Sequence, residues 1–248
     1  LFYYDEINLF KPEKVLDNGY RYYSIYQLEV FNVIYTLKDM GMPLKEIKDF
    51  MDKRNPKNIV DLFNYETNKI EKEIHKLKRK QEIMSNKIKI INEAKNMPEE
   101  IFIEKQNEEY LILSNSIDKS KFPYDTNTYM DHLDYCYNND LYIGFPVGTI
   151  KTMDDLKSNN LTDYSFYYSK VNKNCNDKNL IIKPAGTYVV GYLKGYYIKA
   201  PIIYKKLMDY INENNLTLAG YAYEDVLIDE VGVKDTDEFV LKVSIHIK

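Results

Sequence analysis

Cysteine is scarce and tryptophan is absent in this 248-residue sequence. The two cysteines, Cys136 and Cys175, lie far apart, with no Cys-x-x-Cys spacing and no cluster of histidines nearby. Neither a structural zinc site nor a disulfide framework is therefore predicted. No apolar run approaches the length that a membrane-spanning helix needs. These absences favour a cytoplasmic protein without a bound metal or cofactor.

Charge is divided unevenly along the chain. The net charge is −4, but residues 1–97 carry 18 Lys and Arg against 15 Asp and Glu, so the excess of acidic residues lies in the remainder. A mildly basic front half joined to an acidic back half predicts two modules with different partners.

Turn and capping signals divide the first 56 residues. Asn18-Gly19 predicts a tight β-hairpin turn, in which both central residues would have positive φ. Ser24 and Gln27 have the spacing of a capping box at the start of a helix, and Pro43 suits the first turn of a second helix. The predicted order is a short helix, a hairpin and two helices.

Glycine and proline are missing from residues 58–95, which predict one helix about 57 Å long at 1.5 Å per residue. Its apolar residues recur every seven positions and form a narrow stripe between lysines and glutamates. Such a stripe favours a coiled-coil dimer, and the alternative is a helix lying on its own domain. The repeating residues are Phe63, Ile70, Leu77, Met84 and Ile91.

The stretches YYDEINLFKP, NGYRYYS and QLEVFNVIYTLKDMGMPLKEIKDFM, followed by the heptad helix, together resemble the MerR family of transcription regulators. The resemblance implies a winged helix-turn-helix in residues 1–56 whose recognition helix opens the sequence, with the first helix of the motif absent. It implies that helix 57–97 pairs antiparallel in a homodimer. Promoter DNA and RNA polymerase are the implied partners.

The same resemblance implies a set of DNA contacts. Tyrosine hydroxyls and arginine can donate hydrogen bonds to phosphate oxygens. The alternative is that the tyrosines are core residues and Arg21 is a solvated charge. Phe2 departs from the family pattern, because an arginine commonly stands there. The implied DNA-binding residues are Tyr3, Tyr4, Lys11, Arg21 and Tyr22.

Residues 98–248 contain a pattern of strand, helix, strand, strand that occurs twice. It predicts an α+β domain with an antiparallel sheet. The first round is predicted at 101–114, 124–138, 141–149 and 163–171, and the second at 184–193, 200–213, 217–228 and 239–247.

The stretches KPAGTYVVGYL, YKKLMDYINENNLTLAGYAYEDVLID and VSIHIK resemble the GyrI-like effector-binding domain. Joined to the front half, they resemble the multidrug-sensing branch of the MerR family. That branch implies a lipophilic, cationic effector and activation by untwisting promoter DNA. By the resemblance, Glu224 pairs with the effector's charge, and Tyr142, Tyr164 and Tyr188 line its pocket.

The residues themselves single out Glu224. Alternate residues of a strand share a face, which places Glu224 among apolar neighbours such as Ala222 and Val226. A carboxylate there costs several kcal/mol unless it is protonated or paired. No basic residue is near it in the sequence. A cationic ligand could compensate the charge of this carboxylate. The alternatives are that Glu224 lies at a solvated strand end or pairs with a distant lysine.

Three functions remain open at this point. The first is a ligand-responsive transcription regulator without catalytic activity, which the front half favours. The second is a GyrI-like hydrolase with Glu224 as general base, and the third is a drug-sequestering protein. Metal sensing is disfavoured, because residues 92–120 contain none of the cysteines that the metal-binding branch places there.

Overall fold

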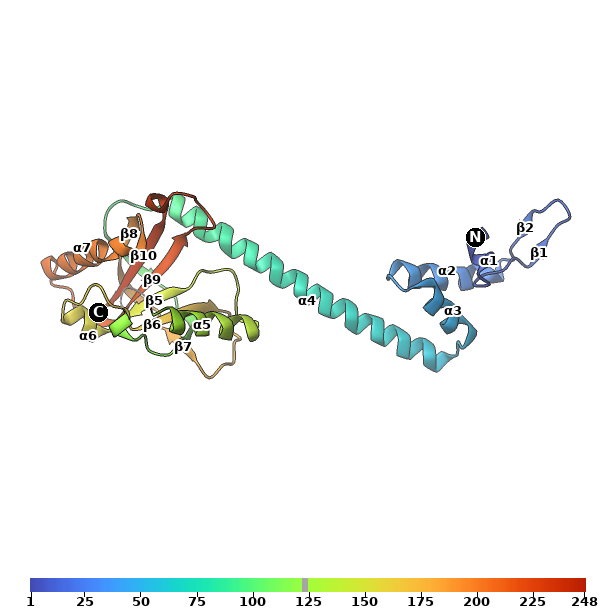
Figure 1. Ribbon diagram of the computed structural model, residues 1–248, viewed down its shortest axis with the longest axis horizontal. Helices are drawn as coiled ribbons and strands as arrows, with labels where there is room; N and C mark the ends of the chain where they lie inside the picture. The colour runs from blue at the N-terminus through green and yellow to red at the C-terminus, as the bar shows by residue number, and fades with distance from the viewer. Residues whose placement is uncertain (122–124) are drawn as a thin grey trace. The chain divides into compact units, whose positions relative to one another are not determined.

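A computed structural model describes residues 1–121 and 125–248 (Figure 1). The chain divides into two compact units, Leu1–Leu77 and Lys78–Lys248. One long helix, α4 (Pro56–Lys95), contributes residues to both units. The architecture is mixed α+β, as predicted.

The first unit begins with a helix, a hairpin and two helices, which confirms the predicted order. Its elements are α1 (Phe2–Glu6), β1 (Lys14–Val15), β2 (Arg21–Tyr22), α2 (Tyr26–Asp39) and α3 (Leu44–Asp52). A small apolar core holds these elements together, and its buried members are Leu9, Phe10, Ile34, Leu37, Ile47 and Met51.

The hairpin turn differs from the predicted two-residue turn. Val15 pairs with Arg21, so the connecting loop runs from residue 16 to residue 20. Gly19 has φ +82°, and its N–H donates to the carbonyl of Leu16. In this longer loop only Gly19 adopts the left-handed conformation that favours glycine, whereas the predicted type required it of Asn18 as well.

Helix α4 confirms the long predicted helix and begins two residues earlier. The Asn55 side chain accepts a hydrogen bond from the N–H of Asn58 at 2.9 Å near the start of α4. The apolar heptad residues are largely exposed on the single chain. Their exposed fractions are 37% for Phe63, 44% for Ile70, 54% for Leu77 and 59% for Met84.

The second unit is built around an antiparallel sheet, which has eight strands within the described residues, in the order β3-β8-β10-β9-β5-β6-β4-β7 (Figure 1). The strands are β3 (Phe102–Gln106), β4 (Glu109–Leu113), β5 (Gly148–Lys151), β6 (Phe166–Val171), β7 (Leu180–Lys183), β8 (Gly186–Lys194), β9 (Leu218–Ile228) and β10 (Val240–Ile247). The helices are α5 (Thr126–Asn138), α6 (Met153–Lys157) and α7 (Ala200–Glu213), with 3-10 turns η1 (Lys119–Lys121), η2 (Tyr197–Lys199) and η3 (Thr236–Glu238).

The predicted repeat is present as β4-α5-β5-β6 and β8-α7-β9-β10. In the sheet, the first round has the order β4-β6-β5 and the second has β8-β10-β9, and the two rounds meet where β5 pairs with β9. The fold therefore places β5 and β9, the second strand of each round in the sequence, side by side at the centre of the sheet.

Several boundaries differ from the prediction. The predicted strand 101–114 is two strands, because β3 pairs with β8 whereas β4 pairs with β6 and β7. Only the end of 141–149 is a strand, and β7 and α6 were not predicted. The predicted helix start at 124 lies outside the described residues.

The loop from 139 to 147, which precedes β5, is shaped by close contact with α4. Gly144 has φ +102°, and a Cβ at this position would lie 2.5 Å from the backbone oxygen of Ile83. Asn86 on α4 donates from its side-chain amide to the carbonyl of Ile143 at 2.7 Å. A glycine is needed here for both its backbone conformation and its lack of a side chain.

The two faces of the sheet have different surroundings. Helix α7 packs on one face, where Ile203 and Leu207 join a core with Val189 and Ala222. The neighbouring residues Tyr188 and Tyr223 point to the other face and join a separate cluster. Ile90 and Ala94 of α4 pack on Leu227 and Val240.

Candidate functional site

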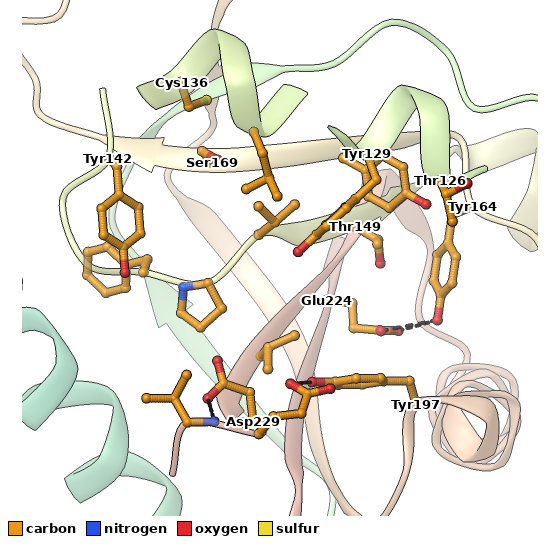
Figure 2. A pocket seen from close by; sticks show the side chains of 18 of the residues that line it. Thr126, Tyr129, Cys136, Tyr142, Thr149, Tyr164, Ser169, Tyr197, Glu224 and Asp229 are labelled. Carbon is orange, nitrogen blue, oxygen red and sulfur yellow. Dashed lines mark hydrogen bonds between the residues drawn. The ribbon is translucent and has the colours of Figure 1, made fainter. Parts of the chain in front are cut away.

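A cavity of about 550 Å³ opens in the second unit on the face of the sheet that bears α5 (Figure 2). Side chains from α5, β5, β6, β9 and η2 line it, together with Lys87 of α4. Its walls are rich in aromatic rings. Within the part of the chain that the structure describes, the lining tyrosines are Tyr129, Tyr137, Tyr142, Tyr164, Tyr167, Tyr196 and Tyr197.

Glu224 lies at the base of this cavity and is 3% exposed. The Tyr164 hydroxyl is 3.1 Å from each carboxylate oxygen (Figure 2). The strand register places Thr149 of β5 directly opposite Glu224, and the Thr149 hydroxyl is buried without a hydrogen-bond partner among the described residues. The cavity floor therefore has an unused hydrogen-bonding group beside a nearly buried carboxylate.

A lysine accompanies Glu224, although none is near it in the sequence. Lys151 is the last residue of β5 and is fully buried. It pairs with Ala222, which is two residues before Glu224 on β9, so its side chain lies on the same face of the sheet as Glu224. Burial raises the pKa of Glu224, and the charge of Lys151 and the hydroxyls of Tyr164 and Tyr204 only partly oppose this. The distant lysine considered from the sequence is thus present, and only the strand register identifies it.

The other end of the cavity carries neutral polar groups. Ser169 and Cys136 line it there, away from Glu224 (Figure 2). Behind them, Nε2 of His132 lies 2.9 Å from the Ser169 hydroxyl and 3.7 Å from the Cys136 sulfur. Burial lowers the pKa of His132 to about 4 and raises the pKa of the Cys136 thiol. Both groups are therefore uncharged near neutral pH.

Two more carboxylates stand at the rim of the cavity. Asp229 lies 3.8 Å from the Lys87 ammonium, and Glu230 accepts a hydrogen bond from the Tyr197 hydroxyl at 3.3 Å. Among the described residues, three carboxylates and one lysine line the cavity. This arrangement makes the cavity attractive to a cation.

Three of the four predicted effector-binding residues come together. Tyr142, Tyr164 and Glu224 line the same cavity, but Tyr188 is outside it. Tyr188 has the opposite strand parity, because it lies beside Val189, whose side chain packs against α7. Its hydroxyl donates to the carbonyl of Pro184 at 2.7 Å, and its ring stacks on the imidazole of His246 on the face of the sheet away from the cavity.

Sequence reasoning missed several lining residues, among them Tyr129, Tyr167 and Tyr197. Tyr129 and Tyr167 meet edge to face, with ring centroids 5.2 Å apart. The alternation in β6 could have placed Tyr167 and Ser169 on one face. The contact with α5 could not be predicted in the same way, because it depends on how the helix crosses the sheet.

The predicted DNA-binding residues lie on α1, the hairpin and the segment between them. Tyr3, Lys11 and Tyr22 are exposed, whereas Tyr4 packs against the core of the first unit. The Arg21 Nε donates to the Asp5 carboxylate at 2.9 Å, linking the hairpin to α1. Its guanidinium also lies 3.7 Å from the centroid of the Phe2 ring, so Phe2 supports the arginine side chain.

Titratable side chains do not gather into a metal site in the part of the chain that the structure describes. No group of three or more His, Cys, Asp or Glu residues is suitably arranged there. None of the described helices is long and apolar enough to cross a membrane.

Known proteins resemble both units. Residues 1–54 match the family model described as MerR HTH family regulatory protein. The whole chain is 31% identical over 252 residues to the multidrug-efflux transporter 2 regulator of Bacillus subtilis (strain 168), covering 90% of that protein. The multidrug-efflux transporter 1 regulator of the same organism is 49% identical over 51 residues, which are 20% of this chain and 18% of that protein.

Among solved structures, the EcmrR–DNA complex in EcmrR-RPo is 18% identical, with a TM-score of 0.46. The match covers all of this chain and 93% of that chain. Membership follows from the full-length relative together with the N-terminal family match. The chain belongs to the MerR family of DNA-binding transcription regulators, and it is similar along its whole length to the multidrug-efflux transporter 2 regulator of Bacillus subtilis (strain 168).

Proposed function

We propose that this protein is a ligand-responsive transcription regulator whose effector is a lipophilic, cationic small molecule. One observation carries the proposal: a cavity of about 550 Å³ with tyrosine walls surrounds a nearly buried carboxylate, in a chain that also has a MerR-type DNA-binding region. Aromatic faces attract a desolvated cation by about 2 kcal/mol. Glu224 supplies the opposite charge, and Tyr142 and Tyr164 supply stacking surface.

The first unit would bind promoter DNA through α1 and the hairpin. Tyr3, Lys11 and Tyr22 are exposed and can reach phosphate oxygens. Arg21 would contact the DNA while its ion pair with Asp5 holds the hairpin to α1. Tyr4 would pack α1 against the core of the first unit and would also contact DNA. Activation would follow from untwisting a promoter so that RNA polymerase can engage it, which makes DNA deformation part of the mechanism.

The cavity and α4 share a wall, which offers a route for the effector signal. Lys87 of α4 lines the cavity and pairs with Asp229. Residues 142 and 145–147 also line it, and Gly144 between them lies close to the backbone of Ile83 on α4. A ligand that displaces this loop, or competes for Asp229, would change the contacts of α4.

The heptad residues of α4 would pair two chains in an antiparallel coiled coil. Large apolar side chains such as Leu77 and Met84 are more than half exposed on the single chain, and a dimer would remove them from water. The functional modules would then be residues 1–56 for DNA, 57–97 for dimerisation and 98–248 for the effector. Replacing Leu77 and Met84 with lysine should give monomers in sedimentation, and a stable dimer would contradict this assignment.

A regulatory role without catalysis fits the site better than hydrolysis does. The Glu224 carboxylate accepts a hydrogen bond from the Tyr164 hydroxyl and is influenced by the charge of Lys151, an arrangement that suits reversible binding. We infer that the protein acts in the cytoplasm, where its DNA partner is. Incubation of effector candidates with the protein should leave them chemically unchanged, and a hydrolysis product would favour the enzyme alternative.

The decisive experiment is a reconstituted transcription assay on the DNA upstream of the protein's own coding region. We expect tighter binding to this region than to random DNA, and more transcript when tetraphenylphosphonium, an aromatic lipophilic cation, is added. Arg21→Ala should weaken binding to all DNA sequences and reduce its dependence on salt. Equal affinity for the upstream region and for random DNA would contradict the proposal.

A further inference from the structure

Lys151 is buried directly behind the cavity. Its ammonium donates to the backbone carbonyl of Asp163. The same nitrogen lies 4.2 Å from the centroid of the Tyr164 ring and 4.8 Å from that of the Tyr204 ring. Two tyrosine faces therefore bracket a cation that belongs to the protein itself.

This arrangement reproduces the features expected of a binding site for a foreign cation. Aromatic faces and a nearby carboxylate are the groups that hold a desolvated ammonium. Tyr164 serves both sides, because its ring face contacts Lys151 while its hydroxyl contacts Glu224. An effector that approaches Glu224 thus meets a carboxylate that already has a neighbouring positive charge.

The charges around Lys151 come from several elements. Glu224 on β9, Asp155 on α6 and the side chain of Asp163 favour its charged form, whereas Lys119 on η1 opposes it. Burial has the largest effect and lowers the pKa of Lys151. The ammonium is therefore retained near neutral pH mainly through its acidic neighbours, and Glu224 is the acidic neighbour that also lines the cavity.

We propose that Lys151 is an internal counter-cation that shares Glu224 with the effector and thereby sets how strongly the cavity distinguishes cationic from neutral ligands. While both groups are charged, the net charge at the cavity floor is close to zero. A cationic effector then gains less from Glu224 than it would from an isolated carboxylate. Lys151 is in this sense a residue that determines specificity without touching the ligand.

The first test needs no ligand. The Glu224 carboxyl is followed by NMR titration in the wild-type protein and in Lys151→Met, with Lys157→Met as the control because Lys157 is exposed on α6. Loss of the lysine charge should raise the titration midpoint of Glu224 by about one pH unit or more, and the control should leave it in place. An unchanged midpoint in Lys151→Met would overturn the proposal.

A reciprocal measurement serves if Lys151→Met does not fold. The Lys151 ammonium is titrated in the wild-type protein and in Glu224→Gln. Because coupling between two sites is reciprocal, the midpoint of Lys151 should fall in this variant by about as much as that of Glu224 would rise. A Lys151 midpoint that ignores the loss of the carboxylate would equally overturn the proposal.

The ligand test depends on the proposed function as well. Burial lowers the pKa of Lys151 to about 8, so the wild-type lysine is largely neutral at pH 9 and Lys151→Arg, which keeps its charge, takes its place in this test. Tetraphenylphosphonium and neutral triphenylphosphine oxide are compared by calorimetry in Lys151→Arg and Lys151→Met at about pH 9, where Glu224 is ionised in both variants. The ratio of cation to neutral affinity should be about tenfold higher in Lys151→Met than in Lys151→Arg, and equal ratios in the two variants would overturn the inference. If neither compound binds wild-type protein while the Glu224 midpoint still shifts, the proposed effector class fails and the role of Lys151 stands.

Discussion

Glu224 and Asp225 are consecutive residues of β9 that point to opposite faces of the sheet, and their surroundings differ sharply. On the far face, the Asp225 carboxylate lies 2.8 Å from the Lys170 ammonium and accepts a hydrogen bond from the Tyr168 hydroxyl at 2.7 Å. On the cavity face, Glu224 has tyrosine hydroxyls and the more remote charge of Lys151. One carboxylate has a direct ion pair and the other does not.

The two pKa values move in opposite directions as a result. Burial alone would raise both. For Asp225, the charges of Lys170 and Lys183 outweigh burial and hold its pKa below the usual range. For Glu224, burial prevails and its pKa is raised. Completeness of pairing, rather than burial, therefore distinguishes a structural carboxylate from one that can bind a ligand.

The largest effect is expected from breaking the paired side. Asp225→Asn removes the negative charge but leaves Lys170 mostly buried, with Glu109 as a remaining partner at 3.0 Å. Breaking a buried ion pair costs roughly 3 to 5 kcal/mol in the free energy of unfolding. Urea denaturation followed by circular dichroism measures this loss.

The matched control is the neighbouring residue. Glu224→Gln makes the same chemical change on the cavity face, where it removes an incompletely paired charge. We expect the free energy of unfolding without ligand to stay the same or to rise. Similar losses in Asp225→Asn and Glu224→Gln would show that the two faces do not differ in the way described.

The next effect concerns the neutral end of the cavity and its dependence on pH. Burial lowers the pKa of His132 from 6.5 to about 4, so the unfolded chain takes up a proton more readily than the folded protein. The free energy of unfolding is therefore not reduced by His132 above about pH 6.5, and it decreases as the pH falls from 6.5 toward 4. The loss should reach about 3 kcal/mol at 1.36 kcal/mol per pKa unit.

Replacement of the imidazole tests this expectation. His132→Gln keeps a side chain that can hydrogen-bond Ser169, but it does not titrate in this range. Its unfolding free energy should vary less between pH 6.5 and 4 than that of the wild-type protein, and His75→Gln on the exposed surface of α4 serves as the control. A slope that His132→Gln leaves unchanged would assign the pH dependence to other groups.

The sequence predicts the architecture well where local patterns decide it. The heptad spacing of α4 and the period-two alternation of β9 are local, so the long helix and the face of Glu224 could be predicted. The partnership of Glu224 with Lys151 depends on which strands pair and in what register, and 72 intervening residues separate them in the sequence. Tyr188 illustrates the same limit. Neighbouring residues of a strand point to opposite faces, and the side chain of Tyr188 lies on the face of the sheet away from the cavity.

The loop that carries Tyr142 was predicted as a strand for a related reason. Its apolar residues resemble a strand segment in isolation, but several of them face the cavity and Gly144 packs on α4. Tertiary contacts therefore override the local pattern.

The smallest expected effect is the change in ligand affinity when Glu224 loses its charge. Glu224→Gln keeps the shape and most hydrogen bonds of the side chain but removes its charge. Affinity for tetraphenylphosphonium should fall by about tenfold or more, equivalent to about 1.4 kcal/mol. Affinity for neutral triphenylphosphine oxide should change little, because burial against the tyrosines remains. Titration calorimetry on both compounds gives the two ratios.

Glu230→Gln at the rim is the matched control for this experiment. Glu230 is exposed, so its effect on the cation should be smaller and should diminish as salt screens it, whereas the effect of the buried Glu224 should persist. Equal losses for the cation and the neutral compound in Glu224→Gln would mean that Glu224 shapes the cavity without recognising charge. No loss for either compound would place the effector elsewhere and remove the functional contrast between the two faces of β9.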